Sequence, residues 1–403
     1  MIKIQNILFI AILVTAFTTV YGQDSTQTEK DLRIFSVIPG NTKMVITGVT
    51  WFGFQSNLNR SNNTIPKTTF NDFGFSPMFL YKLSDRLFFE SEIEIKNDGT
   101  ADNSAAVDLE YAKLSYTLNK FMTIGAGKML SPFGAYNERW EPNHIERFPN
   151  APFRPDDGLL KDDSHLFWGA VMGMDVRGCI PMGSAKMNYV LYVCNGPKLH
   201  TEPGMGGMIQ YENWNDNNSN KEIGGRIGIL PFSNSSLELG LSGKYGIASN
   251  EGDPVYKNIG AAAYAIDYSF VKSIDEIKSN INIRGQFTSL SVDKANYQLA
   301  DGTPYTFDNT LQSSFTQFSI RPTMVSSKFL RKTELMFRYC FVTTPVNTDW
   351  YNYGGVGGTT TRVDLGLTYW LNWRTGLRFA YETETMPDGT KQNGFFMRIA
   401  TGL

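Results

Sequence analysis

The sequence predicts an all-β protein: a transmembrane antiparallel β-barrel of about 16 strands. Three observations support this fold class. Apolar and polar residues alternate in segments that recur from about residue 42 to residue 403, whereas helical periodicity is almost absent. Short and long connections alternate strictly between these segments. After the N-terminal segment no apolar run reaches the length of a membrane-spanning helix, so a helical membrane protein is excluded.

The N-terminal segment has the features of a secretory signal peptide. In residues 1–22, Lys3 supplies positive charge, an apolar run follows it, and the small residue Gly22 precedes Gln23. The alternative is a transmembrane anchor, for which the apolar run is too short. We expect a signal peptide at 1–22, a short periplasmic lead at 23–41 and the barrel at 42–403.

The composition limits the partners of the chain. Its 403 residues carry 37 Lys and Arg against 39 Asp and Glu, a net charge of −2, so we expect no nucleic-acid partner. The three cysteines are predicted to be free thiols, because Cys179 and Cys194 lie out of register in one hairpin. Pairing of two of them is the alternative.

The predicted strands share a length of about 9 to 17 residues and an alternating pattern. The clearest one spans 86–97, where Leu87 and Phe89 lie on one face and Glu90, Glu92 and Glu94 on the other. The strands are predicted at 42–56, 70–83, 86–97, 105–118, 120–128, 166–180, 185–196, 221–231, 235–247, 258–271, 276–292, 313–326, 329–342, 360–371, 373–385 and 394–403. In the strand at 105–118 the alternation slips near 111–113, which indicates a bulge.

The connections point to an outer-membrane barrel. Every second connection is short, such as Ser84-Asp85 and Ser327-Lys328, and those between are long and polar, such as 197–220 and 293–312. Bacterial outer-membrane barrels have short periplasmic turns and long external loops. Aromatic residues beside the short turns favour an interfacial girdle over ordinary strand composition: Tyr81, Phe88, Tyr116, Phe121, Tyr268, Phe270, Phe329, Tyr369, Trp370 and Trp373.

The longest connection, residues 129–165, follows the fifth predicted strand. It contains five prolines, which prevent long helix or ladder pairing, together with Phe, Trp and many charged residues. Connections of this length are functional or disordered. We expect a loop that folds into the barrel mouth and narrows it, with Arg139, Arg147 or Arg154 at the narrowest point.

Alternation along the strands also predicts which charges line the lumen. Acids on the early strands (Glu90, Glu92 and Glu94) face bases elsewhere on the wall: Lys128, Arg284, Arg321, Arg338, Arg362, Arg374 and Arg378. Guanidinium groups bind carboxylate and phosphate, so the arginine excess predicts a mild preference for anions. The alternative is local pairing of the bases with Asp175, Glu238, Asp267, Glu334, Asp364 and Glu382.

The sequence contains no motif for a chemical reaction. Histidine occurs only at positions 144, 165 and 200, and no phosphate-binding loop or nucleophile elbow is found. We therefore expect no enzyme activity, no cofactor and no metal. The alternatives are a metal pair at Glu141 and His144, weak calcium binding at paired aspartates of the loops, and a lipid hydrolase built as a barrel.

The words LEYAKLSYTLNKF and MTIGAGKMLSPFGAYNERW resemble the phosphate-selective porin family of O and P type. The match comprises Gly127, Lys128, Pro132, Phe133 and Gly134, at the junction between a strand and the long loop. The resemblance implies a homotrimeric, water-filled channel whose loop and wall bases guide anions, phosphate among them. The early acidic strands depart from the dense basic pattern of that family.

We therefore expect a porin in the outer membrane of a Gram-negative bacterium. It would contact outer-membrane lipid and act as a passive diffusion channel for small hydrophilic solutes, with a mild preference for anions. The alternative is an outer-membrane barrel that serves as an adhesion or assembly scaffold and has a lumen closed by the long loop.

Overall fold

The computed structural model describes residues 43–58, 68–97, 105–140, 145–152, 169–201, 207, 209–211, 214–298, 301–344 and 358–403. The expected signal peptide (1–22), the expected lead (23–41) and Arg154 lie outside the described residues. So do Glu141, His144 and the paired aspartates of the long loop.

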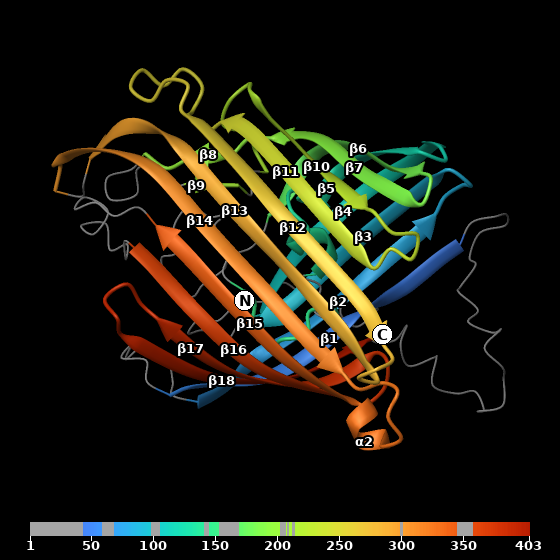
Figure 1. Ribbon diagram of the computed structural model, residues 1–403. Helices are drawn as coiled ribbons and strands as arrows, with labels where there is room; N and C mark the ends of the chain where they lie inside the picture. Colours follow the sequence, from blue (N-terminus) through green and yellow to red (C-terminus); the bar gives the residue numbers. More distant parts are fainter. Residues whose placement is uncertain are drawn as a thin grey trace, which may run out of the picture.

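Sixteen strands form one closed antiparallel barrel (Figure 1), which confirms the predicted fold class. In chain order the barrel strands are β1 (Lys43–Asn57), β2 (Thr68–Lys82), β3 (Leu87–Asn97), β4 (Ala105–Asn119), β5 (Met122–Leu130), β6 (Ala170–Met182), β7 (Ala185–Asn195), β10 (Lys221–Leu230), β11 (Leu237–Ile247), β12 (Gly260–Ile274), β13 (Ser279–Gln298), β14 (Pro304–Arg321), β15 (Thr333–Thr344), β16 (Gly358–Trp370), β17 (Thr375–Thr385) and β18 (Lys391–Gly402). Four short elements complete the described chain: η1 (Tyr136–Trp140), β8 (Lys198–Leu199), β9 (Ile209–Gln210) and α2 (Lys328–Arg331).

The first and last strands close the barrel. β1 pairs with β18 from Val49 opposite Gly402 onward. The Leu403 backbone N–H donates to the Gly48 carbonyl at 2.8 Å, and the Thr47 hydroxyl donates to the Leu403 carbonyl at 2.8 Å. No strand edge is left for lipid to cover, which a spanning sheet requires.

The two faces of the wall have opposite chemistry. Large apolar side chains point outward, such as Ile223 at 67% exposed and Leu241 at 60% exposed. Between them, Arg226 and Asp267 point inward and are 3% and 1% exposed. An apolar exterior and a charged interior suit a barrel surrounded by lipid and are the reverse of a soluble barrel.

Aromatic residues gather at the short-turn end of the barrel. Phe329 and Trp373 are 63% and 79% exposed there, and the Phe329 ring lies tilted against Tyr369 at 5.5 Å between centroids. This placement fits the expected interfacial girdle, because such rings favour the boundary between lipid and water.

One predicted short turn is wrong. β14 ends at Arg321, before Pro322, and the connection to β15 contains the one-turn helix α2 instead of a two-residue turn at Ser327-Lys328. Pro322 has no N–H for the ladder, so pairing stops there. The Ser327 hydroxyl then caps the helix by accepting from the Leu330 N–H.

Two other sequence predictions concern the early strands and the hairpin of β13 and β14. The register between β3 and β4 shifts so that Glu92 faces Tyr111 and Ile93 faces Leu109, which leaves Glu110 as the extra residue of a bulge. The predicted slip at 111–113 lies one residue away.

The hairpin of β13 and β14 is longer than predicted, so its loop is shorter than 293–312.

Among the described residues no helix is long and apolar enough to cross a membrane. The three cysteines are free. Cys194 and Cys340 are buried as expected, whereas Cys179 is exposed, and the β6–β7 register places Cys179 opposite Asn188 rather than Cys194.

Candidate channel interior

Two glycines fix how the chain leaves β5 and enters the long loop. Gly127 has a φ of +135°, and a Cβ added there would lie 2.2 Å from the Ala112 carbonyl oxygen. Gly134 has a φ of +73°, and a Cβ added there would lie 2.6 Å from the Gln286 side-chain amide. Both positions therefore require glycine. Both belong to the motif by which the sequence resembles a porin family.

The first part of the loop is anchored to β11 and β13, which lie four and six places from β5 in the barrel order. The Gly134 N–H donates to the Ser242 hydroxyl of β11 at 3.0 Å. The N–H groups of Ala135 and Tyr136 donate to the Gln286 side-chain oxygen of β13 at 2.9 and 3.0 Å. Because buried N–H groups need acceptors, these two inward polar side chains hold the loop in place.

The helical turn η1 contacts β6, β11 and β14 in addition to β13. The rings of Tyr136 and Trp140 meet the edge of Phe315 of β14 at centroid distances of 5.4 and 6.0 Å. The loop charges are also paired: Arg139 contacts Glu238 of β11 at 2.5 Å. In addition, Arg177 of β6 contacts Glu138 at 2.8 Å.

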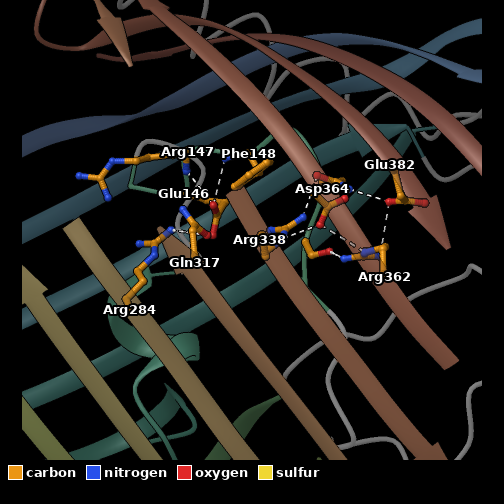
Figure 2. Close-up of polar contacts among 11 residues, drawn as sticks. Glu146, Arg147, Phe148, Arg284, Gln317, Arg338, Arg362, Asp364 and Glu382 are labelled. Atoms are coloured by element: carbon orange, nitrogen blue, oxygen red, sulfur yellow. Dashed lines mark hydrogen bonds and ion pairs between the residues drawn. The ribbon is translucent and has the colours of Figure 1, made fainter. Parts of the chain in front are cut away.

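The later part of the loop, residues 145–152, lies against β13 to β17 (Figure 2). Glu146 contacts Arg284 of β13 at 2.9 Å and accepts from the N–H groups of Arg147 and Phe148 at 2.8 and 3.0 Å. Burial by itself would raise the pKa of Glu146, but Arg284 and Arg338 together with these N–H groups hold the pKa below its ordinary value. Glu146 is therefore a carboxylate at neutral pH.

Asn150 connects the loop to three strands. Its amide nitrogen donates to Asp364 of β16 at 3.0 Å and to Glu382 of β17 at 2.7 Å. Its amide oxygen accepts from Arg338 of β15 at 2.8 Å. The Arg338 guanidinium also lies 4.3 Å from the centre of the Phe148 ring, which is 0% exposed. A single amide thus uses both its donor and its acceptor to join the loop to a buried charge network.

The same network continues to β17 (Figure 2). Asp364 contacts Arg338 at 2.7 Å and Arg362 at 3.4 Å, and Arg362 contacts Glu382 at 3.5 Å. Arg362 also donates to the carbonyl of Ala151 in the loop. Buried charges of this kind need partners, because an unpaired buried ion is costly.

A second network lies on the wall between β4 and β12. Arg226 pairs with Asp267 at 2.6 Å and with Glu238 at 2.9 Å. Lys113 reaches Asp175 at 2.9 Å across Gly125, where a Cβ would lie 2.2 Å from both side chains. The absence of a side chain at that glycine makes room for the pair.

The six acids that the sequence analysis gave as alternative partners of the inward bases all form ion pairs: Asp175, Glu238, Asp267, Glu334, Asp364 and Glu382. Local pairing is therefore the arrangement in the structure. Sequence alternation places charges on a face, whereas partners across several strands depend on the closed barrel.

The structure brings some of the expected lumen residues together and separates others. Five bases meet at the loop: Arg139, Arg147, Arg284, Arg338 and Arg362. Lys128 is 3% exposed and lies 3.7 Å from Asp108, and Arg378 is 1% exposed. Arg321 lies at the short-turn end, where it donates to the Arg331 carbonyl.

Arg374 differs from the expectation of a wall residue. β16 ends at Trp370 and β17 begins at Thr375, so Arg374 lies in the exposed turn between them. Its guanidinium lies over the exposed Trp373 ring, 4.2 Å from the centroid. The predicted strand at 373–385 began two residues too early.

The sequence analysis missed a second segment that packs on the lumen wall. Residues 198–211 were expected in an external loop, but β8 and β9 form a small hairpin whose Leu199 and Ile209 are buried. The Leu199 N–H donates to the Ala248 carbonyl at 2.8 Å, and Asn309 of β14 donates to the Gly207 carbonyl at 3.2 Å. The small inward residues of β12 leave space for this hairpin: Ala261, Ala263 and Ala265.

Comparisons with known proteins support the fold. No family model matches the chain, and no curated protein sequence matches it. Among solved structures, OmpF of Salmonella typhi in complex with daunomycin has a TM-score of 0.58 and 12% identity over 90% of this chain and 98% of that one. The anion-selective porin of Comamonas acidovorans has a TM-score of 0.56 and 11% identity over 90% and 100% of the two chains.

The outer-membrane channel DcaP of Acinetobacter baumannii has a TM-score of 0.55 and 11% identity over 90% of this chain and 97% of that one. At these identities the likeness establishes the fold alone. The chain thus has the fold of a closed 16-stranded antiparallel β-barrel, similar to the barrels of these channels. Phosphate selectivity is implied by the sequence resemblance alone.

Proposed function

We propose that this protein is a porin in the outer membrane of a Gram-negative bacterium, through which small hydrophilic solutes diffuse without a chemical step. The main support for this proposal is the loop after β5, which reaches from β5 to Gln286 of β13 and Glu382 of β17 on the inward face. A segment held across a barrel in this way narrows the opening and sets the size of the solutes that pass.

The homotrimer is part of this proposal and rests on the resemblance to the phosphate-selective porin family. Outer-membrane lipid is the expected partner of the apolar exterior. Among the described residues no group of three or more His, Cys, Asp or Glu side chains is arranged to hold a metal ion.

The ion preference of the channel depends on which charged side chains face water. The expected anion preference depended on arginines that face water, but Arg284 and Arg338 are 2% and 0% exposed and lie in ion pairs. A paired, covered guanidinium has little attraction left for a passing phosphate. These buried arginines therefore do not supply the anion preference expected from the sequence.

The scaffold function is the second candidate, and one observation favours it. The loop and the β8–β9 hairpin both pack on the lumen wall, and Phe148 of the loop is 0% exposed. A lumen filled this way could be closed to solutes, and the external loops would then carry the function.

Conductance separates the two candidates. The mature protein reconstituted in a planar bilayer should give discrete current steps, and deletion of residues 136–160 should enlarge each step severalfold because the constriction is removed. A matched control is deletion of the exposed turn residues 251–255, which should leave the steps unchanged. A silent bilayer would favour the scaffold, and steps of unchanged size after the loop deletion would place the loop outside the conduction path.

A further inference from the structure

The inward segments cover one arc of the lumen wall. The long loop contacts Gln286 of β13, Arg338 of β15 and Glu382 of β17, and the β8–β9 hairpin contacts Asn309 of β14. All these contacts fall between β11 and β17, apart from the ion pair of the loop with Arg177 of β6. Water and solutes are displaced from that arc by protein.

Most charges on the covered arc lie in ion pairs. Four guanidinium groups contact four carboxylates: Arg147 with Glu334, Arg284 with Glu146, Arg338 with Asp364, and Arg362 with both Asp364 and Glu382. The distances run from 2.7 to 3.5 Å, and the sum of the four pairs is zero. Arg378 of β17, which is 1% exposed, is a fifth guanidinium group on the same arc. Most of the charge on this arc is therefore neutralised by neighbouring side chains.

The wall at β3 and β4 has a different balance. The two strands carry five acids and two bases, a difference of three negative charges. One of the bases, Lys113, contacts Asp175 of β6. The other, Lys96, contacts Glu94.

The register places the acids on the inward face. Glu90 stands opposite Lys113, Glu92 opposite Tyr111, and Glu94 opposite Asp108. The alternate positions point to lipid: they include Val107, Leu114 and Tyr116, which are 67%, 43% and 43% exposed. The Asp108 side chain is 45% exposed although Lys128 lies 3.7 Å away, so water reaches this part of the lumen.

We propose that the aqueous route follows β3 and β4, and that Glu90, Glu92, Glu94 and Asp108 make the channel prefer small cations. This inference rests on the proposed porin function and specifies its solute class. Carboxylates on one side of a narrow aqueous path, with low-dielectric walls around it, raise the local concentration of cations. The cations do not need a fixed binding site, because a field that extends about 10 Å at 0.1 M salt covers the path.

The test uses the mature protein in planar bilayers with a KCl gradient. The wild type should give a reversal potential with a K⁺-to-Cl⁻ permeability ratio above one, and Glu90→Gln with Glu92→Gln and Glu94→Gln should lower the ratio about threefold. The matched control removes the same three charges from fully exposed turns: Asp85→Asn, Asp301→Asn and Asp388→Asn. The control should keep the wild-type ratio.

Current steps with a wild-type ratio at or below one would overturn the cation route while leaving the porin function intact. An unchanged ratio in the triple Gln variant would do the same. Absence of steps in the wild type would refute the porin function and this inference with it. If the triple variant does not fold, as judged by its heat-modifiable gel mobility, the single Glu92→Gln variant must still lower the ratio.

Discussion

The early and late arcs of the lumen wall have the same strand pattern but different surroundings. On β13 to β17, inward arginines such as Arg338 are covered by the loop and paired with acids such as Asp364. On β3 and β4, inward acids lie partly exposed, with Asp108 at 45%. An inward charge can therefore hold a loop in place or act on a solute, and burial distinguishes the two roles.

Replacement of Arg338 should have the largest effect on stability. Arg338→Met leaves the Asp364 carboxylate, which is 0% exposed, without its closest partner, and we expect a loss of about 3–5 kcal/mol. Urea unfolding in detergent would measure it. Arg374→Met, in an exposed turn, is the control. Equal stability of the two variants would show that the Arg338 pair does not hold the late arc together.

Removal of the loop anchor on β13 should have a smaller effect. Gln286→Ala leaves the N–H groups of Ala135 and Tyr136 without their acceptor, at a cost of about 1–3 kcal/mol. The cost falls on the docked loop, so single-channel recordings should show larger and noisier steps. The control variant Gln298→Ala, at the exposed end of β13, should give wild-type current steps. Wild-type steps from Gln286→Ala would mean that other contacts hold the loop.

Acid should loosen the later part of the loop. The pKa of Glu146 lies below its ordinary value in the folded protein, so its contribution is fully present above about pH 4.3, the unfolded value, and is lost as the pH falls through the folded pKa. Stability of the wild type should decrease over that acid range. Glu146→Gln should be less stable at neutral pH and should show a smaller acid decrease. Parallel pH curves for the two proteins would contradict this role.

The smallest effect is expected at Arg374. This residue lies in an exposed turn at the short-turn end, where water and salt screen its charge. Arg374→Gln should leave conductance and reversal potential unchanged in the bilayer assay. A shift as large as that of the triple Gln variant would mean that the conduction path has its selective part at this end.

The strand pattern made most of the fold predictable. All 16 strands appear near their predicted positions because alternation with a period of two is a local property. The errors have local causes that the pattern does not show, such as Pro322 ending β14 before α2. The β8–β9 hairpin was missed because its two-residue strands are too short to form a pattern.

The candidate site was less predictable than the fold. The sequence predicted Arg284, Arg338 and Arg362 on the inward face, and in the structure all three are buried in ion pairs. It did not show that Glu146 and Asn150 of the loop would reach them. Those contacts join residues more than 100 positions apart, and such partners are set by loop docking in the closed barrel.

By itself, the sequence determined that the chain folds as a barrel with an apolar exterior and a charged interior, because side-chain direction alternates residue by residue. Only the tertiary structure decided which of the inward charges neutralise one another and which face water. That division depends on where the loop after β5 and the β8–β9 hairpin pack inside the barrel. The Asp108 side chain of β4 is 45% exposed, for example, whereas Arg338 of β15 is 0% exposed in its ion pair with Asp364.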